Sequence, residues 1–426
     1  MNRVLLTVLS LTAGCSSRKE ALLLTVGPFE DDLAAAVLSA ELPIEISKDS
    51  TVSLLAEGKS EGSRLTAQVE PLGKMSRVHW VARDLKKGSK TRLVVRILAV
   101  DVEKNPRIQP ERGPDGSIAI DLGPLGGCFY TRIVAGPEAA KPYLYPLFIE
   151  HIHFTRRYPM EEFPGEDRDH VHQRSFWFTH GDVEGVDFWS EGPKAGKIRQ
   201  KEVLAAEYGH VFARVATRNE WIAPDGRKLL DDVSEYRFYE IERLGAMIDF
   251  TITLTASGAP VTFGDTKEGT FGIRLAESMK EKRGGRIENS RGQVGMKNAW
   301  GKPAEWIDYT GKVQWKFEDK RNDFTSSGED TFGVAIFDHP TSFRHPTTWH
   351  VRDYGLFAAN PFGLRDFTGD KTKDGSYRLE KGQSITFRYR VYFHRGTTEE
   401  AKVGAIYRAY AKPPAVRVEP AEPKKE

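Results

Sequence analysis

Histidine side chains concentrate in two short windows of this sequence. Eight of the eleven histidines lie within residues 151–180 or 339–350. The first window contains Asp169-His170-Val171-His172-Gln173-Arg174 and His180-Gly181-Asp182, and the second contains His345-Pro346 and Trp349-His350-Val351-Arg352. An imidazole close to a carboxylate is a common donor or acceptor of protons near neutral pH. Because glycine and proline interrupt both windows, we expect them on loops or strand ends, where sites are usually built.

A third segment contributes a carboxylate. Phe263-Gly264-Asp265-Thr266-Lys267-Glu268-Gly269 connects two stretches in which apolar and polar residues alternate. A tight strand connection would hold Glu268 in place, although a solvated turn would have the same composition. We expect the catalytic residues to be His172, His180, Glu268 and His345. We expect the substrate-binding residues to be His170, Arg174, Asp182, Asp187, Trp189, His350 and Arg352.

The tryptophans near these residues have two interpretations. Trp177, Trp189 and Trp349 belong to a residue type found more often in a core than in a ligand site. An indole among polar groups also offers a flat apolar surface that suits the C–H face of a sugar ring. Scattered through a core, so many ionisable groups would cost several kcal/mol of desolvation, whereas in a wet cleft they cost little. We therefore expect the site residues to line one groove beside at least one tryptophan.

The elements that must position these residues are strands. Residues 248–254 and 385–393 alternate apolar and polar side chains, which predicts half-buried antiparallel strands. Shorter runs at 65–69, 78–81 and 93–98 also predict strands. A capping box of Thr397 and Glu400 predicts one short C-terminal helix, which ends at Pro413.

These patterns predict an all-β protein with two folded domains. We expect residues 25–116 to form a small β-sandwich, with the Pro- and Gly-rich segment Asn105–Gly116 as its exit linker. We expect residues 117–412 to form a large antiparallel β-sandwich that carries the site. The tail, residues 413–426, is rich in Pro, Glu and Lys and is expected to be disordered.

Composition excludes several classes of function. The 62 basic and 60 acidic residues nearly cancel, so we expect no nucleic-acid partner. After residue 14 no apolar run approaches the roughly 20 residues of a membrane-spanning helix. Cys15 and Cys128 are too few for a disulfide scaffold or a cysteine-rich zinc site. We expect no cofactor, and a divalent metal bound by histidines stays open.

The N-terminus has the features of an export signal. Arg3 is followed by an apolar run and then by Thr12-Ala13-Gly14-Cys15. This resembles a bacterial lipoprotein signal, in which the cysteine becomes the lipidated first residue of the mature protein, although Thr12 stands where leucine is usual. Ordinary secretory cleavage is the alternative. In both cases we expect an exported protein, and lipid on Cys15 would anchor it to a membrane facing the periplasm or the cell exterior.

Several motifs together resemble a known family. They are Tyr145-Pro146-Leu147, Thr155-Arg156-Arg157-Tyr158-Pro159-Met160, Asp169-His170 with His172 and Arg174-Ser175, His180-Gly181-Asp182, Phe263-Gly264-Asp265-Thr266 with Glu268-Gly269, and Trp349-His350-Val351-Arg352-Asp353-Tyr354-Gly355. Across residues 120–412 the chain resembles the uncharacterised family often labelled methane oxygenase PmoA. Its members usually read Asp-His-Pro-His-His-Arg-Ser, where this chain has Val171 and Gln173. The methane-oxidising subunit of that name spans membranes, so the shared label implies no shared chemistry.

That family is similar in architecture to the galactose-mutarotase type of β-supersandwich. In that fold a histidine and a glutamate act as acid and base on a sugar held in an open groove. The order here, with histidines before Glu268, is compatible with that arrangement. The resemblance therefore implies a carbohydrate ligand more than it implies a reaction.

Three functions remain open at this point. The first is a carbohydrate-active epimerase, lyase or hydrolase, with His172 or His180 as acid, Glu268 as base, and Arg174 or Arg352 binding an acidic or hydroxyl group. The second is a lipoprotein that binds glycans without catalysis. The third is a metal-dependent oxidoreductase with three imidazole ligands, for which the sequence has no spacing of high specificity. Sugar turnover separates the first from the second, and metal analysis separates the third.

Replacing Cys15 with Ala tests the lipoprotein signal. Without the thiol no lipid can be attached, so the variant should be released as soluble protein or should remain an unprocessed precursor. Membrane fractionation and gel mobility measure both outcomes. A variant that fractionates and migrates like the wild-type protein would show that Cys15 is not lipidated.

Overall fold

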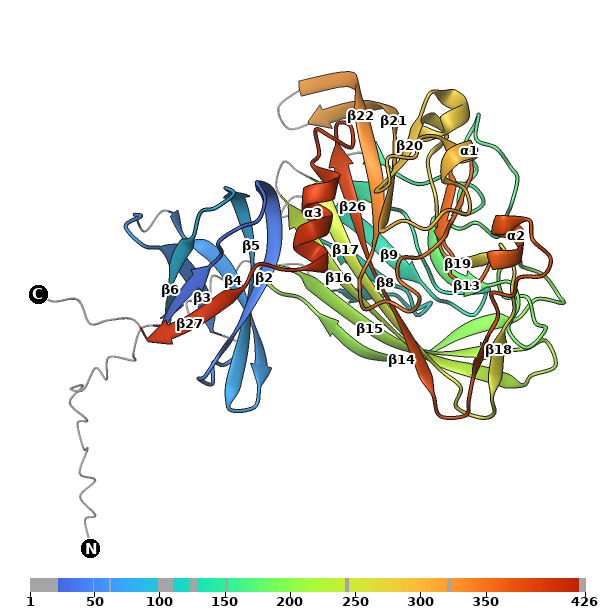
Figure 1. Cartoon of the computed structure of the whole chain (residues 1–426), viewed down its shortest axis with the longest axis horizontal. Coiled ribbons are helices and arrows are strands. Elements are labelled where there is room, and N and C mark those ends of the chain that lie inside the picture. Colours follow the sequence, from blue (N-terminus) through green and yellow to red (C-terminus); the bar gives the residue numbers. More distant parts are fainter. Residues whose placement is uncertain are drawn as a thin grey trace, which may run out of the picture.

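The computed structural model describes residues 22–48, 50–60, 63–98, 110–122, 129–149, 152–241, 245–319 and 324–420. Within these ranges the regular secondary structure is mostly antiparallel β-strand, which confirms the predicted fold class. Figure 1 shows a smaller lobe, which contains the N-terminal strands and the last strand of the chain, and a larger lobe with the rest. The predicted signal, Cys15, Cys128 and His151 lie outside the described residues.

The smaller lobe is one seven-stranded sheet. Its strand order is β2 (Leu33–Leu42), β5 (Met75–Leu85), β4 (Leu65–Leu72), β3 (Thr51–Ala56), β6 (Thr91–Leu98), β1 (Leu22–Val26) and β27 (Val416–Pro420). The two edge strands, β2 and β27, contact each other. The sheet therefore wraps around a core of its own, which includes Leu24, Val52 and Trp80.

The C-terminal tail differs from the expectation. Strand β27 pairs antiparallel with β1, from Pro420 opposite Leu22 to Val416 opposite Val26. Val416 and Val418 pack against the core of the smaller lobe. The expected disorder of the tail is therefore wrong for residues 416–420. Although the tail is mostly polar, Val416 and Val418 lie at alternate positions of β27, and this is enough for the segment to form the edge strand of a sheet.

The larger lobe is a sandwich of two antiparallel sheets. The ten-stranded sheet has the order β12 (Ile152–His153), β11 (Phe148–Ile149), β9 (Phe129–Val134), β10 (Tyr143–Leu144), β13 (Phe176–His180), β19 (Gly269–Arg274), β24 (Leu356–Ala359) and β23 (Trp349–Val351), with β8 (Ile118–Asp121) beside β9 and β7 (Glu111–Arg112) beside β8. The eight-stranded sheet has the order β14 (Lys197–Glu207), β15 (Ala213–Ile222), β16 (Lys228–Ile241), β17 (Gly245–Thr255), β26 (Ser384–Arg395), β22 (Phe324–Asp338), β21 (Trp306–Asp319) and β20 (Arg286–Asn289). Apolar side chains of both sheets form the largest core. Strands β18 (Val261–Phe263) and β25 (Tyr377–Leu379) form a separate ribbon.

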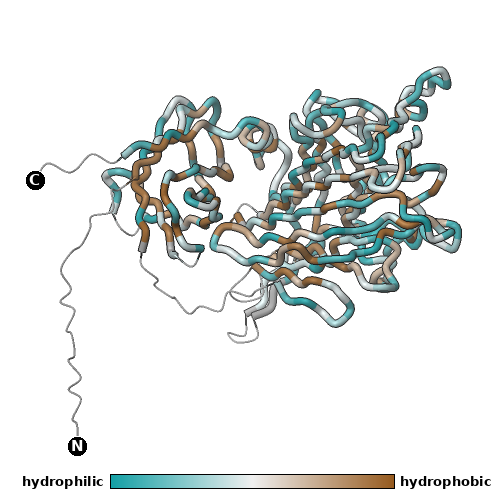
Figure 2. The backbone as a smooth tube through the Cα atoms, turned by 90° about the horizontal axis from the view of Figure 1, so that it is seen from below, coloured by the Kyte–Doolittle hydropathy of each residue, from teal (hydrophilic) through white to brown (hydrophobic). Residues whose placement is uncertain are grey.

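The two strongest strand predictions are neighbours in this sandwich. Residues 248–254 lie in β17 and residues 385–393 lie in β26, and the two strands pair from Ala246 opposite Phe393 to Thr255 opposite Ser384. Figure 2 shows hydrophobic and hydrophilic positions along the strands of both lobes. The alternation in the sequence therefore reports the buried and exposed faces of the eight-stranded sheet.

The larger lobe begins earlier than the predicted linker allows. Residues 105–109 of that linker lie outside the described ranges. Its second half, however, contains β7, which pairs with β8 of the larger lobe. The Gly113 N–H donates to the Ser117 carbonyl at 2.8 Å and closes the turn between these strands. Pro and Gly at 113–116 therefore mark a hairpin turn.

The described residues contain few helical segments. They are α1 (Met296–Ala299), α2 (Leu364–Thr368), α3 (Val403–Ala411) and the 3₁₀ turns η2 (Glu277–Met279) and η3 (Glu281–Arg283). The predicted capping box forms, with the Thr397 N–H 2.8 Å from Glu400 Oε2, but it lies in the turn before α3. In Figure 1, α3 lies between the two lobes. None of the helices in the described ranges has the length and apolar character needed to cross a membrane.

Deleting β27 should destabilise the smaller lobe. A chain that ends at Lys412 loses the burial of Val416 and Val418 and leaves β1 as an unpaired edge, at a cost of roughly 1 to 3 kcal/mol. Thermal unfolding followed by circular dichroism should show a lower midpoint. A chain that ends at Pro420 keeps β27 and is the matched control. Equal midpoints for the two truncated chains would contradict the structural role of β27.

Candidate functional site

Strand alternation places part of the predicted site on the outer face of the ten-stranded sheet. Along β13, Phe176 and Phe178 belong to the core of the sandwich, so Trp177 between them points to the outer face. Along β23, Trp349 belongs to the same core, so His350 next to it points outward. An apolar cluster covers this outer face and consists of Tyr143, Tyr145, Trp177, Trp189, Leu356 and Ala358.

A glycine makes room for this aromatic layer. A Cβ atom on Gly272 would lie 2.7 Å from the ring of Trp177, closer than real Cβ contacts. Trp177 and Trp189 then pack with their ring centroids 5.3 Å apart, and both are 1% exposed. The indoles therefore form a buried platform below the surface. Trp189 was expected to bind substrate, but it is covered.

Imidazole and phenol rings lie above the aromatic layer. His170 stacks on Tyr354 with centroids 5.0 Å apart, and its ring lies 5.7 Å from that of His172. The ring centroid of Trp189 lies 6.2 Å from the ring centroids of both His172 and His350. His170 is exposed, His172 and Tyr354 are partly exposed, and His350 is buried. We call His170, His172, His350 and Tyr354 the histidine surface.

Charged groups flank the histidine surface. Arg352, in the turn between β23 and β24, donates from Nε to His350 Nε2 at 3.2 Å. Lys267 Nζ lies 2.8 Å from Glu268 Oε1, in the loop before β19. Burial and, to a smaller degree, the carboxylate of Glu268 raise the pKa of the Tyr354 phenol. Three separate loops therefore bring Arg352, Glu268 and the histidines to one face.

The covered imidazoles are neutral at physiological pH. Burial lowers the pKa of His172 to about 4, and the charge of Lys141 acts in the same direction. Burial also lowers the pKa of His350 to about 3, with a further contribution from Arg352. A neutral imidazole has one nitrogen that donates a hydrogen bond and one that accepts. His172, which is partly exposed, can therefore pair with hydroxyl groups, whereas His350 is 2% exposed and its Nε2 already accepts a bond from Arg352.

Two fully buried arginines hold the loop that carries His170. Arg156 Nη1 and Arg274 Nη2 lie 2.5 Å and 2.8 Å from Asp169 Oδ1, and His170 Nδ1 lies 2.8 Å from Asp169 Oδ2. Arg156 also donates to three main-chain oxygens of the same loop. Burial opposes the charge on Asp169, but Arg274, His170 and Arg156 outweigh it and hold its pKa at about 2.

A second ion-pair group lies near His172. Lys141 is 1% exposed, its Nζ lies 3.2 Å from Glu191 Oε1, and it donates to the Trp189 carbonyl at 2.9 Å. Arg174 donates two bonds of 2.7 Å to the carboxylate of Glu191. Burial lowers the pKa of Lys141 to about 8. Arg174, which was expected to bind substrate, therefore already has a bidentate partner within the protein.

His180 lies on the opposite side of the sheet from the histidine surface. On β13 it shares the inward side with Phe178, and it is fully buried. Its Nε2 lies 2.8 Å from the Gly264 carbonyl, and its ring lies 4.8 Å from that of Phe362. Contrary to the expected catalytic role, the ring anchors the loop that carries Glu268.

The other expected site residues also have internal roles. His345 Nδ1 lies 2.9 Å from Asp338 Oδ2, and that carboxylate is fully buried. The carboxylates of Asp182 and Asp187 accept main-chain N–H bonds from their own loop. The ring contacts that join the histidine surface do not include His345. Of the expected residues, the structure therefore brings together His170, His172, His350, Arg352 and Glu268.

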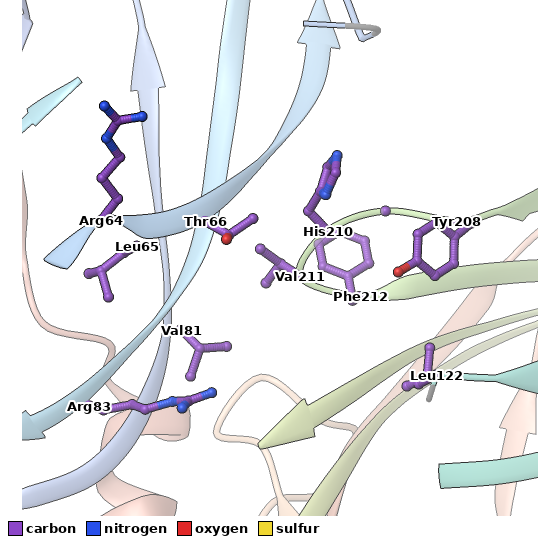
Figure 3. Close-up of a pocket in the computed structure, with 11 residues that line it drawn as sticks. Arg64, Leu65, Thr66, Val81, Arg83, Leu122, Tyr208, His210, Val211 and Phe212 are labelled. Carbon is purple, nitrogen blue, oxygen red and sulfur yellow. The ribbon is translucent and has the colours of Figure 1, made fainter. Parts of the chain in front are cut away.

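Four cavities of about 310 to 580 Å³ lie elsewhere on the protein. None of the expected site residues lines any of the four. The cavity in Figure 3, of about 340 Å³, lies where His210–Phe212 of the larger lobe face Arg64–Thr66, Val81 and Arg83 of the smaller lobe. The candidate site therefore does not coincide with any of these four cavities.

Sequence reasoning missed several residues that build this surface. Tyr354 lies in the motif around His350 but carried no assigned role. Lys141 and Glu191 have no sequence signal, because their pairing depends on contacts between distant loops. Arg156 and Arg274 look like ordinary charged residues and are fully buried. In the described part of the chain, no group of three His, Cys, Asp or Glu side chains is placed to hold a metal ion.

These features define a two-lobed antiparallel β-protein with an exposed polar surface on the outer side of its sandwich. The chain belongs to a family of unknown function, DUF6807, whose model matches residues 125–408. This match gives no support to the methane oxygenase label that the sequence motifs suggested. No curated protein matches the sequence.

Two solved structures are similar to the chain at low sequence identity. One is a protein in glycosyl hydrolase family 38 from Enterococcus faecalis, with 10% identity and a TM-score of 0.42 over 96% of this chain and 49% of that chain. The other is an α-mannosidase from Enterococcus faecalis V583, with 11% identity and a TM-score of 0.39 over 95% and 47%. The chain thus spans about half the length of these two structures.

Replacing Asp169 with Asn should destabilise the larger lobe by roughly 3 kcal/mol at neutral pH, because two buried guanidinium groups lose their carboxylate partner. The folded pKa of about 2 lies below the ordinary value of 3.8. The ionised Asp169 carboxylate therefore contributes its full share to the free energy of unfolding above about pH 4, and this contribution is lost as the pH falls from there toward 2. Urea unfolding at pH 7 and pH 3 measures it.

The difference between wild type and Asp169→Asn should be smaller at pH 3 than at pH 7. Asp370→Asn, which removes a fully exposed carboxylate, is the control and should change stability little at either pH. An equal loss at both pH values would contradict the role assigned to the Asp169 charge.

Proposed function

We propose that this protein binds a carbohydrate at the histidine surface and acts on it by acid–base chemistry, with Glu268 as the base and His172 as a hydrogen-bond partner of the sugar hydroxyls. The observation that supports this is one face that presents the rings of His170, His172 and Tyr354, together with the carboxylate of Glu268, above buried aromatic rings. Such groups pair with sugar hydroxyls. The stacked rings of His170 and Tyr354 offer apolar area for the ring of a sugar.

Glu268 combines a fixed main chain with an accessible carboxylate. The Gly181 N–H donates to the Glu268 carbonyl at 2.7 Å, and a Cβ on Gly181 would lie 2.8 Å from the Glu268 Cβ. The Glu268 side chain is 36% exposed, and its Oε1 lies 2.8 Å from the Lys267 ammonium. A carboxylate that is positioned and accessible in this way is suited to remove a proton from a bound ligand.

Glycan binding without catalysis is the second candidate. It is favoured by the low pKa of His172, about 4, because burial and Lys141 make the imidazole a weak base that is uncharged at neutral pH. In this case the same groups form hydrogen bonds with sugar hydroxyls and move no proton. The two candidates share the ligand and differ in the role of Glu268.

We also propose that the protein is exported and held at a membrane through lipid on Cys15. The support is the N-terminal sequence, in which an apolar run precedes Gly14-Cys15. An exported, anchored protein would meet glycans in the periplasm or at the cell surface. This location suits either of the two candidate functions.

Glu268→Gln distinguishes the two candidates. The amide keeps the shape of the side chain but cannot accept a proton, so turnover should fall by roughly 10² to 10⁴ while sugar affinity and the unfolding midpoint stay nearly unchanged. A panel of glycans is assayed for product release and for binding by calorimetry. Glu380→Gln, on an exposed carboxylate of another loop, is the matched control.

Full turnover by Glu268→Gln would remove Glu268 from the chemistry. Binding without turnover by the wild-type protein would favour the second candidate. A wild-type protein that binds none of the glycans would contradict both.

A further inference from the structure

We infer that the carbohydrate bound at the histidine surface carries a carboxylate, which the guanidinium of Arg352 holds, so that the ligands are uronate-containing saccharides. This inference rests on the proposed function and adds the chemical class of the ligand to it. The starting observation is a difference in pairing between Arg352 and the other cations of this face.

The other cations near the histidine surface have carboxylate partners. Arg174 and Lys141 share Glu191, Lys267 pairs with Glu268, and Arg156 and Arg274 share Asp169. Among the described residues, the structure gives Arg352 no carboxylate partner, and its contacts are the bond to His350 and a position over the ring of Trp300 at 5.3 Å. The neighbouring carboxylate of Asp353 lies 3.4 Å from Lys282 instead.

The contacts of Arg352 fix its orientation and leave its terminal nitrogens for a ligand. Its main-chain N–H donates to the Leu356 carbonyl at 2.7 Å, and its carbonyl accepts a bond of 3.2 Å from the Tyr309 hydroxyl. Its Nε is held by the imidazole of His350. The side chain is partly exposed. A guanidinium fixed in this way loses little freedom when a ligand binds.

The planar fork of a guanidinium matches a carboxylate, to which it can donate two parallel hydrogen bonds. The arginine lies next to groups suited to sugar hydroxyls, so one saccharide residue can present its carboxylate and its hydroxyls to the same face. A sulfate ester on a neutral sugar has a related charge and a tetrahedral shape. The test below separates these two sources of negative charge.

Binding of matched trisaccharides measures the contribution of the carboxylate. The probes are galacturonate, glucuronate and mannuronate trisaccharides, their carboxyl-reduced neutral counterparts, and sulfated forms of the neutral ones. Acidic members should bind the wild-type protein roughly 10- to 100-fold more tightly than neutral ones. This preference should weaken as salt is raised, because the group is partly exposed.

Arg352→Gln should abolish the preference for acidic trisaccharides and leave the affinity for neutral trisaccharides unchanged. Arg352→Lys keeps the charge without the fork and should retain part of the preference, and it also serves if the glutamine variant does not fold. Arg378→Gln, an exposed arginine on β25, is the control and should keep the wild-type preference.

The outcomes separate the inference from the proposed function. Equal binding of acidic and neutral members by the wild-type protein overturns the inference and leaves the proposed function standing. Stronger binding of sulfated members than of uronates overturns the carboxylate assignment, and a preference that survives Arg352→Gln overturns the assignment of the residue. If no member of the panel binds, the proposed function fails and the inference fails with it.

Discussion

The histidine surface depends on one carboxylate, that of Asp169, which two fully buried guanidinium groups share. Removing Arg156 and Arg274 from water is costly, and a single carboxylate cannot neutralise both. Arg156 also donates hydrogen bonds to main-chain oxygens of the loop that contains Asp169, so the loop surrounds the guanidinium group. Burial and the charge of Arg156 lower the pKa of Arg274 to about 10. His170 is fixed by the other oxygen of the same carboxylate, so the exposed ring is positioned by an interaction below it.

The outer face of the ten-stranded sheet explains why a site can form there. One face of each sheet in a sandwich is buried against the other sheet, and the second face is normally solvated. Here the second face carries Trp177 and Trp189, which are almost fully buried, and residues of the loop before β13, including Met160 and His172, pack against this aromatic layer. This additional layer creates a dry platform on which imidazoles can be partly buried and neutral. Loops therefore supply most of the polar side chains of the histidine surface, whereas the strands of the ten-stranded sheet determine where that surface lies.

The sequence predicts the strands well and the site in part, and the difference has a physical cause. Alternation is a local property, so β17 and β26 could be located from their own residues. The clustering of His170, His172 and His350 with Arg352 also reflects real proximity. His180 was grouped with Trp177 although the two are three positions apart, and along a strand an odd separation puts side chains on opposite faces. The pairs around Asp169 and Glu191 join segments that are distant in the chain, and no local pattern encodes them.

Because His172 and His350 are uncharged at neutral pH, the charge at the histidine surface comes from other groups. Since burial holds the pKa values of His172 and His350 near 4 and 3, these two rings do not change charge between about pH 5 and 8. Their hydrogen-bonding capacity is therefore constant over that range, and the net charge they face comes from Arg352 and from the Lys267–Glu268 pair. Lys267 and Glu268 compensate each other, and the guanidinium of Arg352 is partly exposed and has no carboxylate partner among the described residues. The proposed ligand, a saccharide with one negative group, matches this charge better than a cationic ligand would.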